Sequence, residues 1–171
     1  MLRLGPQPLP RTRGLSPGSG IPLIQAAIGF AVPLKSKEEG FPNSPAGMPG
    51  VETSLPLMLT HAMEGRCKIM DVTKWMSAGP AKVYGIQNKG SLIEGYDADL
   101  TLVDLENHRT IYDADTWTRV GWTPYNGMEL TGWPIFTIVD GNVIHKRDIN
   151  GSLKGIAVGK PGETGRVLKF D

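Results

Sequence analysis

NSPAGMPGVETSLPLMLTHAMEGR, residues 43–66, is the most informative segment of this chain of 171 residues. Its first half is dense in glycine, which can adopt positive φ, and in proline, which fixes φ. Together they allow an ordered loop whose backbone can be approached closely. Thr53 or Ser54 is expected to cap a helix that has Pro56 in its first turn and that ends at Gly65. The core-facing residues recur at helical spacing: Leu55, Met58, Leu59, Ala62 and Met63.

Two shorter helices are predicted to follow residue 66. Asp71 caps the first of them through its side chain, and Ser77 caps the second, which ends at Gly85. The first of these helices turns three apolar residues inward: Val72, Trp75 and Met76.

After Gly90 the apolar period becomes two, which is typical of strands. Asp140-Gly141 or Gly141-Asn142 supplies a tight hairpin turn near the end of this region. The expected strands are SLIE (91–94), YDADLTLVDL (96–105), HRTIY (108–112) and two within ELTGWPIFTIVDGNVIHKRD (129–148). The glycine-rich residues 149–171 are expected to form a loosely packed tail.

Charge is distributed unevenly along the chain. Residues 1–37 contain five basic and no acidic residues, whereas residues 38–171 contain 13 basic and 17 acidic residues, giving a net charge of +1 overall. The first 33 residues are rich in proline and lack any periodicity, so we expect a disordered leader. The near-neutral total argues against nucleic-acid binding, which needs accumulated positive charge.

Cysteine content and hydropathy indicate the cellular compartment in which the chain is expected. One cysteine, Cys67, cannot form an internal disulfide, which fits a reducing, cytoplasmic environment. No apolar run approaches the roughly 20 residues of a membrane span, so no membrane partner is expected. Cys67 itself is interpreted as a small, partly buried thiol rather than a nucleophile.

The residues alone predict no catalytic centre. Asp97, Asp99 and Asp104 could hold a hard cation, but strand alternation does not place all three on one face, so turn and strand roles are favoured. Glu52 either accepts backbone hydrogen bonds and rigidifies the glycine loop or acts on substrate, and the structural role is favoured. The histidines lie far apart in sequence and are interpreted as structural: His61, His108 and His145.

Several motifs together resemble one enzyme family. Residues 43–66 are similar to the loop and helix that follow the last barrel strand in long-chain dihydroorotases. SAGPAKVYG (77–85) and KGSLIEGYDADLTLVD (89–104) resemble the wider amidohydrolase superfamily. WTPYNG (122–127) and TGWP (131–134) again resemble the dihydroorotase C-terminus. The likeness covers about residues 34–147.

This resemblance implies an α+β chain, namely the C-terminal fragment of a metal-dependent (β/α)₈ barrel with part of a small composite β-sandwich. Four regions follow from it: an unmatched leader (1–33), the terminal barrel loop and helices (34–88), the sandwich part (89–148) and the tail (149–171). The implied reaction interconverts N-carbamoyl-aspartate and dihydroorotate in pyrimidine biosynthesis. In that reaction, a zinc-held hydroxide attacks the amide carbonyl and an aspartate moves the proton.

Most of the family's chemical groups have no counterpart here. The H-x-H motif is absent, and IGFAV (28–32) stands where D-H-A-P-H would end. We therefore expect no catalytic residue and no metal ligand, and no zinc bound by this chain alone. Ala46 and Gly47 are the residues that carry over, as a pair whose backbone contacts the substrate.

Three functional hypotheses remain open. The chain is a truncated dihydroorotase, active only with a missing N-terminal chain; or a non-catalytic remnant that scaffolds aspartate carbamoyltransferase; or a hydantoinase- or allantoinase-like amidohydrolase. A fragment of this kind would expose sheet edges and the apolar face of the helix in residues 54–63, so association or aggregation is expected.

Overall fold

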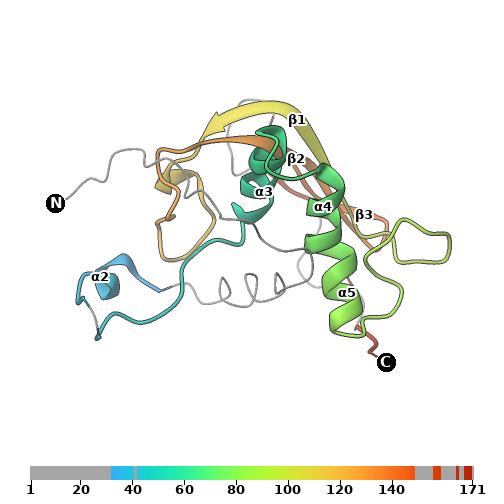
Figure 1. The fold of residues 1–171 in the computed structure, drawn as a ribbon, viewed down its shortest axis with the longest axis horizontal. Helices are drawn as coiled ribbons and strands as arrows, with labels where there is room; N and C mark the ends of the chain where they lie inside the picture. Colours follow the sequence, from blue (N-terminus) through green and yellow to red (C-terminus); the bar gives the residue numbers. More distant parts are fainter. Residues whose placement is uncertain (1–31, 41, 149–155, 159–164, 166–167, 171) are drawn as a thin grey trace.

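The computed structural model describes residues 32–40, 42–148, 156–158, 165 and 168–170, so the expected leader and tail lie mostly outside the described residues. Figure 1 shows helices beside one curved sheet. The helical elements are α2 (Leu34–Lys37), α3 (Ser54–Met63), α4 (Ile69–Thr73), the π-helix η1 (Lys74–Ala78), α5 (Gly79–Val83) and the 3₁₀ turn η2 (Asp113–Asp115). The strands are β1 (Leu100–Thr110), β2 (Glu129–Val139), β3 (Asn142–Lys146) and β4 (Ile156–Ala157).

The sheet is antiparallel throughout, with strand order β1-β2-β3-β4. Asp140 and Gly141 connect β2 to β3 with φ of 50° and 77°, the pair of positive angles that a tight hairpin turn needs. The predicted hairpin is therefore confirmed at Asp140-Gly141. Within the described residues, one small sheet with flanking helices agrees with the α+β expectation.

Two of the predicted strands do not exist as separate strands. SLIE (91–94) is wrong as a strand: it forms an exposed loop between Gly90 and Gly95, both with positive φ, and Leu92 is 87% exposed. HRTIY is wrong as a separate strand because residues 108–110 continue β1. A register shift between Asp104 and His108 interrupts the pairing there without ending the strand.

Helix α3 begins and ends where the sequence predicts. Pro56 lies in its first turn and is buried, and Gly65 follows its end with φ of 75°. The expected side-chain cap is wrong, however, because the Thr53 hydroxyl donates to the Gly50 carbonyl at 3.2 Å. The core-facing stripe is confirmed only in part: Leu59 is 3% exposed, whereas Met63 is 52% exposed.

The next two predicted helices form one continuous helical run from Ile69 to Val83, visible as the long green helix in Figure 1. Ser77 lies inside η1 and caps nothing, so that prediction is wrong. Asp71 does act at a helix start, but from the first turn, where its carboxylate accepts the Lys68 N–H at 2.9 Å. Val72 points inward and is 1% exposed, as expected.

The core lies where α3 packs against the start of β2. Its buried members are Ile111, Leu130 and Trp133, with partly buried Leu57, Tyr125 and Met128 against them. The close approach of α3 requires Gly132, since a Cβ there would lie 2.7 Å from the Leu59 Cβ. No helix among the described residues is both long and apolar enough to cross a bilayer.

Candidate functional site

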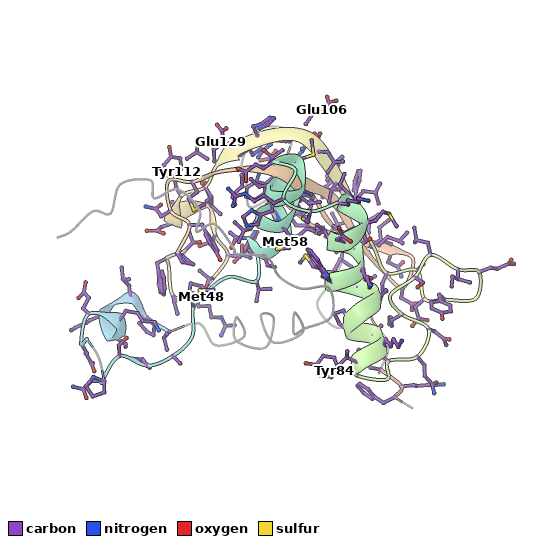
Figure 2. The ribbon with its side chains drawn as sticks, in the orientation of Figure 1. Met48, Met58, Tyr84, Glu106, Tyr112 and Glu129 are labelled. Carbon is purple, nitrogen blue, oxygen red and sulfur yellow. The ribbon has the colours of Figure 1, made fainter. Side chains whose placement is uncertain are left out.

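The glycine–proline loop before α3 presents the predicted substrate-binding pair. Ala46 is exposed and Gly47 is half-buried, and Gly47 has φ of 107°, which L-residues with a side chain disfavour. Met48 follows this pair and is labelled in Figure 2. The end of the loop is bound to α3, because the Gly50 carbonyl accepts N–H groups from Thr53 at 3.2 Å and Ser54 at 2.9 Å. The loop therefore has a positive φ at Gly47, directly after the exposed residue Ala46.

Glu52 joins this loop to the connection between β1 and β2. Both oxygens of its carboxylate accept the backbone N–H of Trp117, at 3.0 and 2.8 Å. The hydrogen-bonding role expected of Glu52 is thus confirmed, although the N–H group belongs to a segment 65 residues away. A carboxylate is a strong acceptor for a backbone N–H, so the contact is well suited to fixing one segment on another.

A second contact joins the same connection to the start of the described chain. The indole N–H of Trp122 donates to the Val32 carbonyl at 2.7 Å, across 90 residues of sequence. Sequence reasoning missed this role of Trp122, and no local pattern reveals a contact of that separation. The only signal was the presence of Trp122 in WTPYNG.

The connection that carries both contacts is itself held by polar side chains. The Asp113 N–H donates to the Asn126 amide oxygen at 2.9 Å, and the Thr123 N–H donates to the Asp113 carboxylate at 2.8 Å. The Tyr112 N–H donates to the Asp115 carboxylate at 2.9 Å. These bonds make the connection an ordered loop, which aspartate and asparagine side chains commonly produce.

A cavity of about 260 Å³ lies beside the Glu52–Trp117 contact. Its lining includes two arginines, a histidine, two tryptophans and a carboxylate: Arg109, Arg147, His145, Trp117, Trp133 and Glu52. Guanidinium groups of this kind bind carboxylates or carbonyl oxygens. Arg147 already donates to the Asp104 carboxylate at 3.0 Å, and this hydrogen bond holds the pKa of Asp104 below its usual value.

The acidic residues considered as cation ligands are engaged in separate contacts. Lys89 pairs with Asp97 at 3.0 Å and with Asp99, and its hydrogen bond to Asp99 raises the pKa of Lys89. Asp99 also accepts the Asp140 N–H at 2.8 Å, which ties the start of β1 to the β2–β3 turn. Asp104 lies apart from them, on Arg147. The turn and strand roles predicted for these aspartates are confirmed.

The histidines and the cysteine are dispersed. His108 Nδ1 lies 2.8 Å from the Thr131 hydroxyl, and burial lowers the pKa of His61, with Arg66 contributing. Burial raises the pKa of Cys67, with Asp71 contributing, which is the reverse of what activates a thiol. Across the described ranges, no three His, Cys, Asp or Glu side chains are grouped closely enough to bind a metal. We therefore assign none of these described residues to the metal that the resemblance implies.

Comparison with known proteins supplies the family context. The sequence model of the amidohydrolase family matches residues 46–144. The chain is 39% identical over 136 residues to a protein named dihydroorotase from Pyrococcus furiosus, a match that covers 79% of this chain and 32% of that protein. The chain thus spans about a third of the length of this curated relative.

Solved structures of similar fold carry hydantoinase names. The L-hydantoinase (dihydropyrimidinase) from Arthrobacter aurescens is 32% identical with a TM-score of 0.65, over 74% of this chain and 28% of that one. A D-hydantoinase is 26% identical with a TM-score of 0.66, over 78% of this chain and 29% of that one. The same fold segment therefore occurs in enzymes named for different cyclic amides.

Proposed function

The chain belongs to the amidohydrolase family, and we propose that it contributes to opening or closing a cyclic amide, in the dihydroorotase reaction between N-carbamoyl-aspartate and dihydroorotate. The observation that carries this proposal is the 39% identity with the dihydroorotase of Pyrococcus furiosus, over 79% of this chain. The left-handed backbone of Gly47, in the loop that resembles the dihydroorotase substrate loop, supports it.

In this proposal the chain supplies substrate binding rather than bond cleavage. The backbone of Ala46 and Gly47 hydrogen-bonds the polar edge of the substrate, which orients the amide for attack. The absence of a side chain at Gly47 lets the substrate approach the main chain closely. The metal implied by the resemblance would activate water, and we assign none of the described residues to it. We also propose that this chain is inactive until a complementing chain joins it.

Complementation tests the proposal. The full chain is mixed or co-expressed with the part of the Pyrococcus furiosus dihydroorotase that it does not match, and conversion of N-carbamoyl-aspartate is followed. We expect the mixture to turn over substrate and this chain alone to be inactive. Activity of the chain alone would contradict its proposed inactivity, and an inactive mixture in which the two parts do associate would contradict the dihydroorotase function.

Two glycine variants test the substrate-binding pair within that mixture. Gly47→Ala should lower kcat/KM by roughly tenfold or more, because the backbone angle that orients the substrate is strained. Gly95→Ala is the matched control: Gly95 also has positive φ, of 90°, and open space around it, but lies outside the glycine–proline loop. Equal losses in both variants would contradict the role of Gly47.

Hydantoinase-type hydrolysis is a second candidate, favoured by the 32% identity and TM-score of 0.65 with the L-hydantoinase. Hydantoin turnover in the complemented enzyme, with N-carbamoyl-aspartate left unchanged, would favour it over the dihydroorotase function. A non-catalytic role beside aspartate carbamoyltransferase remains the third proposal. Co-purification with that enzyme, without turnover in any mixture, would support it.

A further inference from the structure

The segment of residues 33–51, which carries Ala46 and Gly47, is attached at both ends to one loop. At its start, the Val32 carbonyl accepts the Trp122 indole N–H at 2.7 Å. At its end, the Glu52 carboxylate accepts the Trp117 N–H at 2.8 and 3.0 Å. The two donors lie five positions apart in the β1–β2 connection, so both ends of the segment have a common support.

That support is fixed to the sheet. The Gly127 N–H donates to the Ile111 carbonyl at 2.7 Å, and the Ile111 N–H donates to the Met128 carbonyl at 2.9 Å, which closes the base of the connection. Between these points, Thr116 and Thr123 are 8% and 4% exposed. Backbone that is hydrogen-bonded and buried in this way opens rarely, so the two donors hold constant positions relative to the core.

Inside the segment, one further contact leads toward the substrate pair. The Lys37 ammonium donates to the carbonyl of Pro45, the residue immediately before Ala46. The Ser44 N–H donates to the Gly40 carbonyl at 2.8 Å and folds the same stretch on itself. The Trp122–Val32 hydrogen bond is therefore connected to Ala46 through α2 and the contact between Lys37 and Pro45. The Glu52–Trp117 hydrogen bond is connected to Gly47 through the turn at Gly50.

We propose that Trp122 and Glu52 are positioning residues that clamp the two ends of residues 33–51 and so set the backbone of Ala46 and Gly47 for substrate. The substrate part of this inference rests on the proposed function, whereas the clamp itself does not. Fixing both ends of a loop reduces the number of conformations between them. A carboxylate and an indole N–H are suited to this because each forms a directional hydrogen bond with backbone groups.

Hydrogen exchange of backbone amides in the full chain tests the clamp without any substrate. Trp122→Phe keeps an aromatic ring but removes the donor, and Glu52→Met keeps the side-chain length but removes the acceptor. Each should speed exchange by about tenfold or more at the hydrogen-bonded amides of Ser44 and Thr53, which flank the substrate pair. The Leu130 amide in the core should be unchanged. Unchanged exchange at Ser44 and Thr53 in both variants would overturn the clamp.

Two matched controls show that the effect is local. Trp75→Phe changes a half-buried tryptophan on η1, and Glu106→Met changes an exposed glutamate on β1. Figure 2 shows Glu106 at the top of the view, on β1, and Met48 at the lower left. Both controls should leave exchange at Ser44 and Thr53 unchanged. Acceleration there by either control would overturn the inference, because it would reflect general destabilisation.

Steady-state kinetics of the complemented enzyme distinguish a positioning role from a purely structural one. Trp122→Phe and Glu52→Met should raise KM several-fold and leave kcat nearly constant, and Glu52→Gln, which keeps one acceptor oxygen, should restore KM. A purely structural role would instead reduce the amount of active enzyme at constant KM, and that result would overturn positioning. Accelerated exchange without any turnover in the wild-type mixture would leave the clamp supported and contradict the proposed function alone.

Discussion

Gly132 shows how one missing side chain determines the packing of α3 on the sheet. An added Cβ would lie 2.7 Å from the Leu59 Cβ and 2.9 Å from its Cδ1, and φ at this position is +85°. Two separate costs therefore oppose any side chain here: a left-handed backbone angle and an overlap with a buried leucine.

We expect Gly132→Ala to lower the free energy of unfolding by about 2–5 kcal/mol, the sum of roughly 1–2 for the left-handed angle and 1–3 for overpacking. Gly127→Ala is the matched control, since Gly127 has a φ of +82° and no atom within 4 Å of an added Cβ. Gly127→Ala should lose only the roughly 1–2 kcal/mol that belongs to the left-handed angle. Urea denaturation measures both, and equal losses would show that the overlap with Leu59 does not matter.

At the scale of elements, a buried threonine couples α3 to β2. The Thr60 hydroxyl donates to the Pro56 carbonyl at 2.7 Å and accepts the Thr131 N–H at 2.8 Å. Thr131 lies on β2, at a position where its own hydroxyl is 2.8 Å from His108 of β1. The helix thus satisfies a strand N–H that is buried away from water.

Thr60→Val should cost about 1–3 kcal/mol, because the valine keeps the shape of the side chain but leaves the buried Thr131 N–H without its acceptor. Thr73→Val on α4 is the control. Its hydroxyl reaches the Met70 carbonyl at an exposed position, so we expect a change within about 0.5 kcal/mol. Thermal unfolding of both variants measures the difference. A smaller loss for Thr60→Val than for Thr73→Val would rule out this coupling.

At the scale of the whole molecule, the described part combines a small core with large exposed apolar side chains. Leu92, Met70 and Val51 are 87%, 73% and 71% exposed. Where exposed apolar side chains lie next to one another, they form surfaces that other chains commonly cover.

We therefore expect the purified chain to associate. Light scattering should report a mass that increases with protein concentration, and the midpoint of thermal unfolding should rise with it, because association stabilises the folded form by mass action. Replacing Leu92 with lysine should weaken association, whereas Thr73→Lys, an exposed polar position, should not. A monomer with a sharp transition independent of concentration would contradict this expectation.

Local patterns were sufficient for the features whose causes are local. Helical spacing in residues 54–63, the positive φ of Gly65 and the Asp140-Gly141 turn were all predictable, because each depends on neighbours within a few positions. The strand predicted at SLIE was wrong because its cause is not local: a short apolar run becomes a strand only where a partner strand pairs with it. Ser77 failed because the helical run from Ile69 continues past it.

The backbone freedom of the loop at Gly47 and the family resemblance were likewise readable from residues 43–66, since glycine permits positive φ whatever its surroundings. Only the tertiary structure decided which groups meet: Glu52 with Trp117 across 65 residues, and Trp122 with Val32 across 90. Contacts of that separation follow from how α3 and the β1–β2 connection dock on the sheet. That docking is set by packing at Gly132 and Leu59, which no period in the sequence encodes.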